Sequence, residues 1–376
     1  MTAERARRTP ALWWLTPERA VLLSLWLLLA AVVALNSLGT FMTDIKPEVY
    51  LAPGRMTWRY LSAWESGPTL GFPSFNVGLA PITAVLAIPG WLGIPPEVIF
   101  KVWHLILLSV AAFGARRLYR HLVPDGDDTA GAVGRTAIAV AYVANPYVVV
   151  AGSTLAILLP YAFLPWLVYA LLRAFEEPRS WRWPAVFGLC FALMSGANAG
   201  VVPLLQLIAV PAVAFAVLAR SRVTLRQLVT VLTRCAIFVT LLSLYWIVPS
   251  VSAIRAGATV VANSETVQGI ANPSSAAEVL RGLGLWPLYG ADQNGPWEPQ
   301  FVSYLTDRVI VLASFGLPVL AFLGAVVARG RVRLMALGLV VVAVPVMVGV
   351  HPPENPSPFG VALRWSFDHV PVAGAF

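Results

Sequence analysis

Cysteine, histidine and charged residues are scarce in this sequence of 376 residues. Both cysteines, Cys190 and Cys235, lie inside apolar runs, where a thiol behaves as a small hydrophobic side chain, so neither a disulfide framework nor a cysteine-ligated metal site is expected. The four histidines are scattered without ligand spacing. Charged residues make up only 12% of the chain, about half the share typical of soluble domains, which excludes an ordinary soluble globular protein.

Long apolar runs are abundant instead, and 58% of all residues are hydrophobic. Runs of about 17 to 25 apolar residues are long enough to cross a bilayer as helices. The sequence therefore predicts an all-α polytopic membrane protein with about nine transmembrane helices. Their expected ranges are 20–42, 98–120, 133–151, 154–173, 183–199, 201–220, 229–251, 308–328 and 332–350.

The apolar segment 77–94 is the ambiguous one. It is short, has no charged flank and is interrupted by Pro81, Pro89 and Gly90. Length and prolines favour a re-entrant or interface-lying segment rather than a span.

Positive charge is distributed unevenly between the connections. If 77–94 does not cross, 18 of the 26 Lys and Arg residues fall on one side and 8 on the other. The positive-inside rule then places the N-terminus in the cytoplasm and two long connections, 43–97 and 252–307, outside. The net charge of +8 is thus explained by membrane topology rather than by nucleic-acid binding. We expect a plasma (inner) membrane protein whose active site, if it has one, is extracytoplasmic.

The arginine-rich inner connections allow a weaker prediction. Their surplus of positive charge would suit an acidic cytoplasmic partner such as an acyl carrier protein. The alternative is that these arginines are topology determinants that contact anionic lipid.

Asp44 is the candidate reactive residue of the first long connection. It follows the first apolar run directly, at membrane-interface depth, where partial desolvation raises the pKa of a carboxyl and suits it to general-base catalysis. Lys46 and Arg55 are close enough in sequence to supply cations for a phosphate leaving group. Pro53-Gly54 then precedes about three helical turns, with Trp58, Leu61 and Trp64 on one side, as in a helix lying at the interface. Alternatively, Asp44 only ends the helix.

The second long connection has a composition typical of sugar binding. Aromatic rings stack on sugar faces, while amides and carboxylates bond the hydroxyl groups. The alternative is an aromatic belt at the membrane interface together with a loop structured by Pro and Gly. The candidate sugar-binding residues are Trp286, Tyr289, Asp292, Trp297 and Glu298.

Two stretches carry a family resemblance. "TDIKPEVYLAPGRMTWRYLSAWES", with the Gly/Pro-broken segment and second span behind it, resembles the N-terminal membrane region of the actinobacterial α-(1→3)-arabinofuranosyltransferases, which branch cell-wall arabinan. "RGLGLWPLYGADQNGPWEPQFVSY" looks similar as well. The resemblance covers most of the chain in order. It implies a GT-C fold, that of a glycosyltransferase with a lipid-phosphate-sugar donor, whose first outer loop carries the catalytic acid and lies along the membrane on two helices.

By this resemblance the catalytic aspartate is Asp44, followed here by Ile45 where the family has Thr or a similar residue. The implied reaction moves arabinofuranose from decaprenyl-phosphoryl-arabinose to an arabinan hydroxyl of arabinogalactan or lipoarabinomannan. The donor is held in the membrane lipid. Arg55, Arg59 or Arg364 would neutralise the departing phosphate. No cofactor is expected, with a divalent cation left open.

Members of that family are much longer, so residues 1–376 are expected to form a single GT-C-like domain, the N-terminal part of a chain with C-terminal sugar-binding modules. Two other functions stay open. A transporter or flippase of a polyprenyl-linked glycan would need polar residues inside the spans, where Asn145, Asn198 and Gln206 are among the few. A noncatalytic membrane scaffold would only bind glycan.

Overall fold

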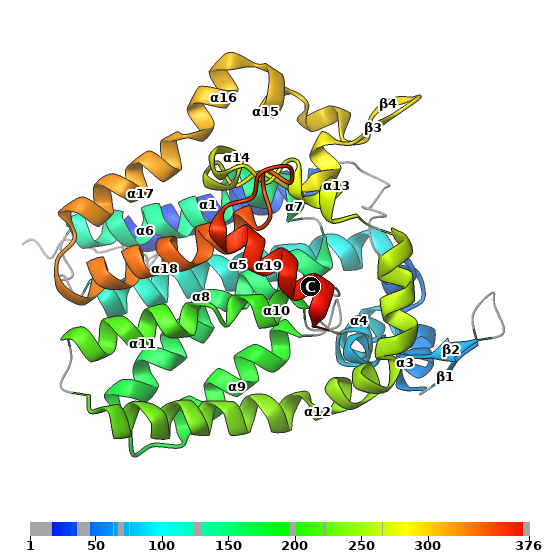
Figure 1. Ribbon diagram of the computed structural model, residues 1–376, viewed down its shortest axis with the longest axis horizontal. Helices are drawn as coiled ribbons and strands as arrows, with labels where there is room; N and C mark the ends of the chain where they lie inside the picture. Colours follow the sequence, from blue (N-terminus) through cyan, green and yellow to red (C-terminus); the bar gives the residue numbers. More distant parts are fainter. Residues whose placement is uncertain are drawn as a thin grey trace, which may run out of the picture.

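The computed structural model describes residues 17–35, 46–62, 64–66, 71–74, 76–123, 129–152, 154–195, 201–220, 223–264 and 266–370. Helices form nearly all of this structure, and the long ones run side by side in one bundle (Figure 1). The bundle helices are α1 (Pro17–Leu35), α5 (Pro96–Leu122), α6 (Thr129–Val143), α7 (Pro146–Ala151), α8 (Leu155–Glu176), α9 (Arg182–Met194), α10 (Val201–Gln206), α11 (Ala209–Arg220), α12 (Leu225–Ser264), α16 (Arg308–Ser314), α17 (Gly316–Val327) and α18 (Gly330–Val348).

Six of the predicted spans coincide with helical segments that are long and apolar enough to cross a membrane, counted over the described residues. The other three coincide with shorter apolar helices, Arg182–Met194, Pro203–Ala219 and Val332–Val348. The apolar composition thus located every one of these segments. The boundary that differs most is the end of α12, which continues to Ser264 although its apolar run ends near residue 251. An apolar run predicts which part of a helix can lie in the membrane. It does not predict where the helix itself ends.

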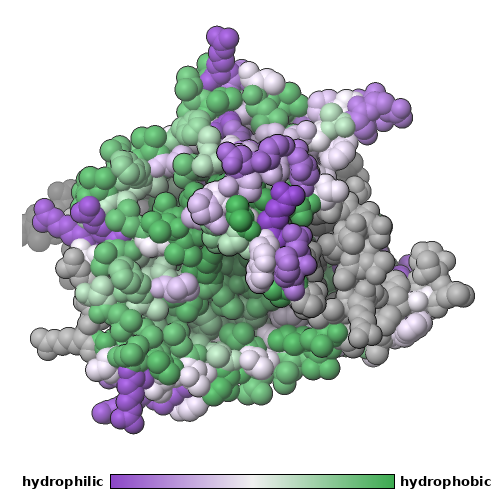
Figure 2. All heavy atoms as spheres, in the orientation of Figure 1, coloured by the Kyte–Doolittle hydropathy of each residue, from purple (hydrophilic) through white to green (hydrophobic). Residues whose placement is uncertain are grey.

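The buried centre of the bundle is α8, which packs against α5 on one side and α9 on the other. Its side chains contribute to both large hydrophobic clusters, for example Leu171 to one and Leu158 to the other. By contrast, no residue of α17 is buried. Figure 2 shows hydrophobic side chains spread over one outer face, with hydrophilic ones gathered mainly at its edges and over the C-terminal segment. Such a face is suited to contact with lipid.

Contacts between α1 and α5 show that the segment between them does not cross the bundle. Lys101 at the start of α5 donates to the carbonyl oxygen of Ala34 at the end of α1, at 3.1 Å. At the opposite end, an Arg116 nitrogen lies 2.5 Å from Glu18 Oε1. The two helices are therefore antiparallel, and residues 36–95 leave and return at the same end. This arrangement agrees with the prediction that 77–94 is not a span, although Asn76–Trp91 is one of the shorter apolar helices of the described residues.

The first long connection contains short helices and a two-stranded sheet. Its helices α3 and α4 pack against each other, and η1 and β2 contact α12. The predicted interfacial helix is present as α3, but it ends before Trp64 because the chain becomes extended at Ser62 and enters β1. The elements are α2 (Glu48–Leu51), α3 (Pro53–Leu61), β1 (Trp64–Glu65), β2 (Phe72–Pro73), the 3-10 helix η1 (Asn76–Leu79) and α4 (Ala80–Trp91).

The second long connection and the C-terminal segment add further short elements. They are α13 (Val267–Ala271), α14 (Ala276–Leu280), η2 (Trp286–Tyr289), β3 (Ala291–Asp292), β4 (Gly295–Pro296), η3 (Pro299–Phe301), α15 (Ser303–Thr306) and α19 (Pro358–His369). In Figure 1 the β1–β2 and β3–β4 hairpins both lie toward the same end of the bundle. The two connections predicted to share one side of the membrane thus extend from the same end.

Candidate functional site

Asp44 lies outside the described residues, so the site is built from the residues that follow it. Lys46 has a left-handed backbone conformation, with φ of 62°. This conformation is uncommon for a residue other than glycine and reverses the chain before α2. The Lys46 ammonium donates to Asn76 Oδ1 at 2.5 Å. The backbone two residues after Asp44 is thereby tied to η1, thirty residues further along the chain.

Glu65 is the centre of a polar network that includes this lysine. Its carboxylate is almost completely buried, with 6% of the residue exposed. One oxygen accepts from Asn76 Nδ2 at 2.8 Å, and the other lies 2.7 Å from a guanidinium nitrogen of Arg59. The sheet makes this arrangement possible, because Glu65 pairs with Phe72 and β2 leads directly toward Asn76. We call Lys46, Asn76, Glu65 and Arg59 the first-loop network.

Hydrophobic packing holds the helices beneath this network. Val49, Tyr50, Met56 and Tyr60 are buried and belong to the same cluster as residues of α4, α5 and α8. The opposite side of α3 is exposed and apolar at Trp58, which is 76% exposed. An amphipathic helix with large exposed apolar side chains is suited to lie at a membrane surface, as the sequence predicted for α3.

Burial shifts the pKa values of Lys46 and Tyr60 in the first long connection. It lowers the pKa of Lys46, although the nearby carboxylates of Glu48 and Glu65 act in the opposite direction. Burial also raises the pKa of Tyr60, whose hydroxyl donates to Glu48 at 3.2 Å. Tyr60 therefore stays protonated, and Lys46 holds its charge less readily than a free lysine does.

The predicted phosphate-binding cations have different surroundings. Lys46 and Arg59 both belong to the first-loop network. Arg55 is exposed on α3. Arg364 lies on α19, where it donates to the carbonyl oxygen of Pro353 at 3.2 Å. Since nothing in the structure tests phosphate binding, these four assignments stay predictions.

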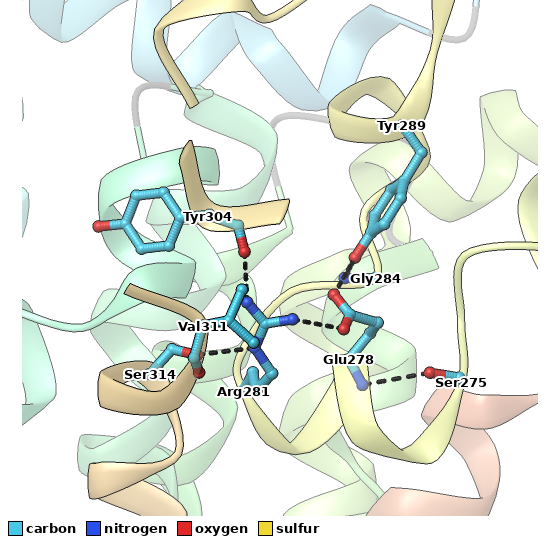
Figure 3. A network of polar contacts seen from close by, with 8 residues as sticks. All are labelled: Ser275, Glu278, Arg281, Gly284, Tyr289, Tyr304, Val311 and Ser314. Atoms are coloured by element: carbon cyan, nitrogen blue, oxygen red, sulfur yellow. Dashed lines mark hydrogen bonds and ion pairs between the residues drawn. The ribbon is translucent and has the colours of Figure 1, made fainter. Parts of the chain in front are cut away.

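The second long connection is organised around Arg281. Figure 3 shows this buried guanidinium reaching Ser314 of α16 and the backbone of α15. It donates to Ser314 Oγ at 2.7 Å and to the carbonyl oxygen of Tyr304, and it forms a 2.5 Å ion pair with Glu278. The second carboxylate oxygen of Glu278 accepts from the Tyr289 hydroxyl. We call Glu278, Arg281, Tyr289, Tyr304 and Ser314 the Arg281 cluster.

The predicted sugar-binding residues divide between this cluster and the β3–β4 hairpin. Tyr289 belongs to the Arg281 cluster, while the rings of Trp286 and Trp297 meet edge to face with centroids 5.6 Å apart. Asp292 caps the hairpin turn by accepting from the Asn294 backbone at 2.7 Å, and Glu298 accepts from Gln300. The structure brings these residues into one region, and their role in sugar binding stays a prediction.

Six residues of these networks are not among the predicted site residues: Glu65, Asn76, Glu278, Arg281, Tyr304 and Ser314. A signal existed for Glu65 and Glu278, because each is an isolated carboxylate within an otherwise apolar or small-residue stretch. Asn76 carried no such signal.

Over the part of the chain that the structure describes, no three His, Cys, Asp or Glu side chains gather to hold a metal ion.

Comparison with known proteins assigns this arrangement to a family. The family model described as alpha-(1->3)-arabinofuranosyltransferase, N-terminal GT-C domain, matches residues 28–373. No curated protein matches the chain.

Solved structures agree on the fold. A cryo-EM structure of arabinofuranosyltransferase AftD from Mycobacteria has a TM-score of 0.54 and 20% identity, over 95% of this chain and 26% of that chain. A mutant of AftD, in its class 2 structure, has a TM-score of 0.51 and 21% identity, over 95% of this chain and 27% of that one. The chain thus spans about a quarter of the length of these structures. Because the family match extends over most of the sequence, the chain belongs to the α-(1→3)-arabinofuranosyltransferase family, within its N-terminal GT-C domain.

Proposed function

We propose that this protein transfers arabinofuranose from decaprenyl-phosphoryl-arabinose to a hydroxyl of cell-wall arabinan. An acceptor oxygen forms a bond to the sugar C1 while the bond from C1 to the phosphate oxygen breaks. The proton of the acceptor hydroxyl passes to the Asp44 carboxylate, and the lipid phosphate leaves with the bonding electron pair. General-base catalysis of this kind typically contributes about 10²- to 10⁴-fold to a rate.

The observation that carries this proposal is the first-loop network directly behind Asp44. A catalytic carboxylate must be held close to its productive position, because a displacement of about 1 Å can cost roughly a hundredfold in rate. The bond from Lys46 to Asn76 restrains the chain two residues after Asp44. Glu65 holds Asn76 in turn. A plain helix end would not need this buried polar support.

The donor phosphate would be met by cations of the same connection. Arg55 is exposed on α3, one turn before Arg59. Arg59 is partly committed to Glu65, since one of its nitrogens forms the ion pair. We assign Arg55 the main role in binding phosphate, supported by Lys46 and Arg59, and keep Arg364 of α19 as a further candidate. A guanidinium is suited to this task because its planar donors match phosphate oxygens.

The site would face the extracytoplasmic side of the plasma membrane. The charge distribution places 43–97 and 252–307 there. A polyprenyl-linked donor arrives through the bilayer, so a reactive residue that follows the first predicted span in sequence would meet its phosphate at the headgroup level.

Turnover by an Asp44→Asn variant tests this function. The purified chain in nanodiscs would receive decaprenyl-phosphoryl-arabinose and an arabinan acceptor. Asparagine is close to aspartate in shape but cannot accept the proton, so turnover should be lost while donor binding and folding are retained. Asp44→Glu should fold and lose about a hundredfold in rate through misplacement.

The matched control is Asp307→Asn, which makes the same change at the exposed N-cap of α16 and should keep most of the activity, because asparagine also caps a helix well. A helix-end role for Asp44 predicts otherwise, because asparagine is a good cap and should cost only tenths of a kcal/mol, roughly. Activity near that of the wild type in Asp44→Asn would remove Asp44 from the reaction. A wild-type chain that binds glycan without turnover would be a scaffold.

A further inference from the structure

A polar pocket adjoins the Arg281 cluster in the second long connection. Its volume is about 310 Å³, at the lower end of the range of roughly 300 to 1,000 Å³ usual for small-molecule sites. It lies between the α13–α14 segment and the residues that follow, and Figure 3 shows the lining side chains of Ser275, Glu278, Arg281 and Tyr289. The lining residues that matter here are Asn272, Ser275, Glu278, Arg281 and Tyr289.

The floor of this pocket is rigid. Arg281 is only 4% exposed and bonds α14 to α15 and α16 through Glu278, Tyr304 and Ser314. The Tyr289 hydroxyl meets Glu278 from the opposite side and also accepts from the backbone nitrogen of Gly284 at 3.3 Å. A buried polar network with its bonds made keeps its geometry before a ligand arrives, which reduces the entropy lost on binding.

The charge of the pocket favours a neutral ligand. Among its lining residues Arg281 is the only cation and Glu278 the only anion, and the two form an ion pair at 2.5 Å. The guanidinium is further occupied by Ser314 and Tyr304. A phosphate would therefore find no uncommitted cation on these walls and would meet the Glu278 carboxylate.

The remaining groups match a polyhydroxylated molecule. The Asn272 amide can donate and accept, and the Ser275 hydroxyl, which accepts from the Glu278 backbone, can still donate. Each Glu278 oxygen keeps further lone pairs after its one bond. The Tyr289 ring and the apolar side chains of Pro273 and Leu305 complete the lining. Hydroxyl-bonding groups beside apolar surface suit a sugar, which has both kinds of surface.

We propose that this pocket binds one neutral sugar unit of the acceptor glycan. The proposal rests on the proposed function, since it assigns the second long connection to the acceptor and leaves the lipid phosphate to the first. The sequence predicted that the sugar contacts Trp286 and Trp297. The proposed pocket instead places the sugar between Asn272 and Tyr289. Asn272, Ser275 and Glu278 would bind the sugar hydroxyls, and Arg281 would act only as a positioning residue.

Binding of a synthetic linear arabinofuranosyl tetrasaccharide to the full chain in nanodiscs tests the proposal. Calorimetry should give a Kd that is at least about tenfold weaker for Asn272→Ala than for the wild type, as expected for loss of one or two hydrogen bonds to a sugar. Asn294→Ala, the same change at an exposed position of the β3–β4 hairpin, should bind as the wild type does. Unfolding temperatures of both variants should match the wild type.

A second variant, Asn272→Trp, should fill the pocket and abolish binding even if the amide contributes little. Arabinose 5-phosphate should bind more weakly than the uncharged sugar. Equal affinity of wild type, Asn272→Ala and Asn272→Trp for the tetrasaccharide would overturn the proposal. Tighter binding of the phosphorylated sugar would overturn it as well.

Failure of this proposal and failure of the proposed function can be told apart. If the wild type transfers arabinose and the acceptor KM is unchanged in both Asn272 variants, the pocket assignment is wrong and the function stands. If no transfer occurs but tetrasaccharide binding is lost in both variants, the pocket assignment stands and the transferase function fails.

Discussion

Lys46 combines three features that rarely occur together in a lysine. Its backbone is left-handed, its side chain is partly buried, and its ammonium contacts an amide rather than a carboxylate directly. Burying an ammonium costs free energy, which the bond to Asn76 and the nearby Glu48 and Glu65 partly offset. A residue kept under these conditions next to the candidate base is consistent with a role in shaping the first-loop network.

The stability of the folded chain should depend on pH through Lys46. Because its folded pKa is lowered, the unfolded chain binds more protons in the window between the folded pKa and the ordinary lysine value of about 10.4. Stability therefore rises with pH through that window. Relative to Lys46→Met, the unfolding temperature of the wild type should increase as pH is raised from about 7 to about 10.

Thermal unfolding of both proteins in the same detergent would measure this difference. The raised pKa of Tyr60 keeps its hydroxyl protonated over this range. A gap between the two proteins that does not change with pH would mean that the Lys46 ammonium is solvated.

Close contact between helices depends on small residues in this bundle. Gly188 of α9 faces α12, where an added Cβ would lie 2.5 Å from Phe238 Cβ and 2.9 Å from the Phe238 carbonyl carbon. Atoms cannot approach so closely, and part of the obstacle is backbone, which cannot rotate away. Small residues at such crossings let membrane helices pack tightly.

Gly188→Ala should therefore push α9 away from α12 and lower the free energy of unfolding by about 1 to 3 kcal/mol. The matched control is Gly324→Ala in α17, where an added Cβ meets nothing within 4 Å. That variant should be neutral or slightly stabilised, because alanine favours a helix. Chemical denaturation of both variants would measure the difference, and equal loss in both would refute close packing at Gly188.

The arrangement of the whole molecule in the membrane can be tested by labelling. Arg179 is exposed in the turn between α8 and α9, and Asp292 is exposed in the β3–β4 hairpin. Single-cysteine variants at these positions should differ, because the positive-inside rule places the turn in the cytoplasm and the hairpin outside. Cys190 and Cys235 are buried and should give little background.

An impermeant maleimide applied to intact cells should label Asp292→Cys, and it should label Arg179→Cys only after the cells are permeabilised. Labelling of Arg179→Cys from outside would invert the topology and move the candidate site to the cytoplasm.

The same inner surface is where an acidic partner would bind. Several arginines there already pair with Glu18, Glu176 and Glu177, so an acidic partner would have to compete for them. That partner stays a prediction.

Composition and charge determined much of the architecture in advance. Helical membrane spans follow from apolar length alone, because backbone groups in a bilayer must bond within their own segment. Arginine placement predicted that the ambiguous segment 77–94 does not cross, and the antiparallel contact of α1 with α5 agrees with this prediction. These properties are local or additive along the chain, so they can be read without knowledge of the packing.

The pairing of polar side chains was decided by the tertiary structure. Lys46 and Arg59 were expected as cations for phosphate, yet Asn76 and Glu65, which the β1–β2 pairing brings together, contact them. Tyr289 was expected to stack on sugar, yet its hydroxyl bonds Glu278. Burial and hydrogen-bond partners depend on residues distant in sequence meeting at a definite angle. The identity of each side chain is therefore encoded locally, but which of its atoms remain free for chemistry is settled only by the fold.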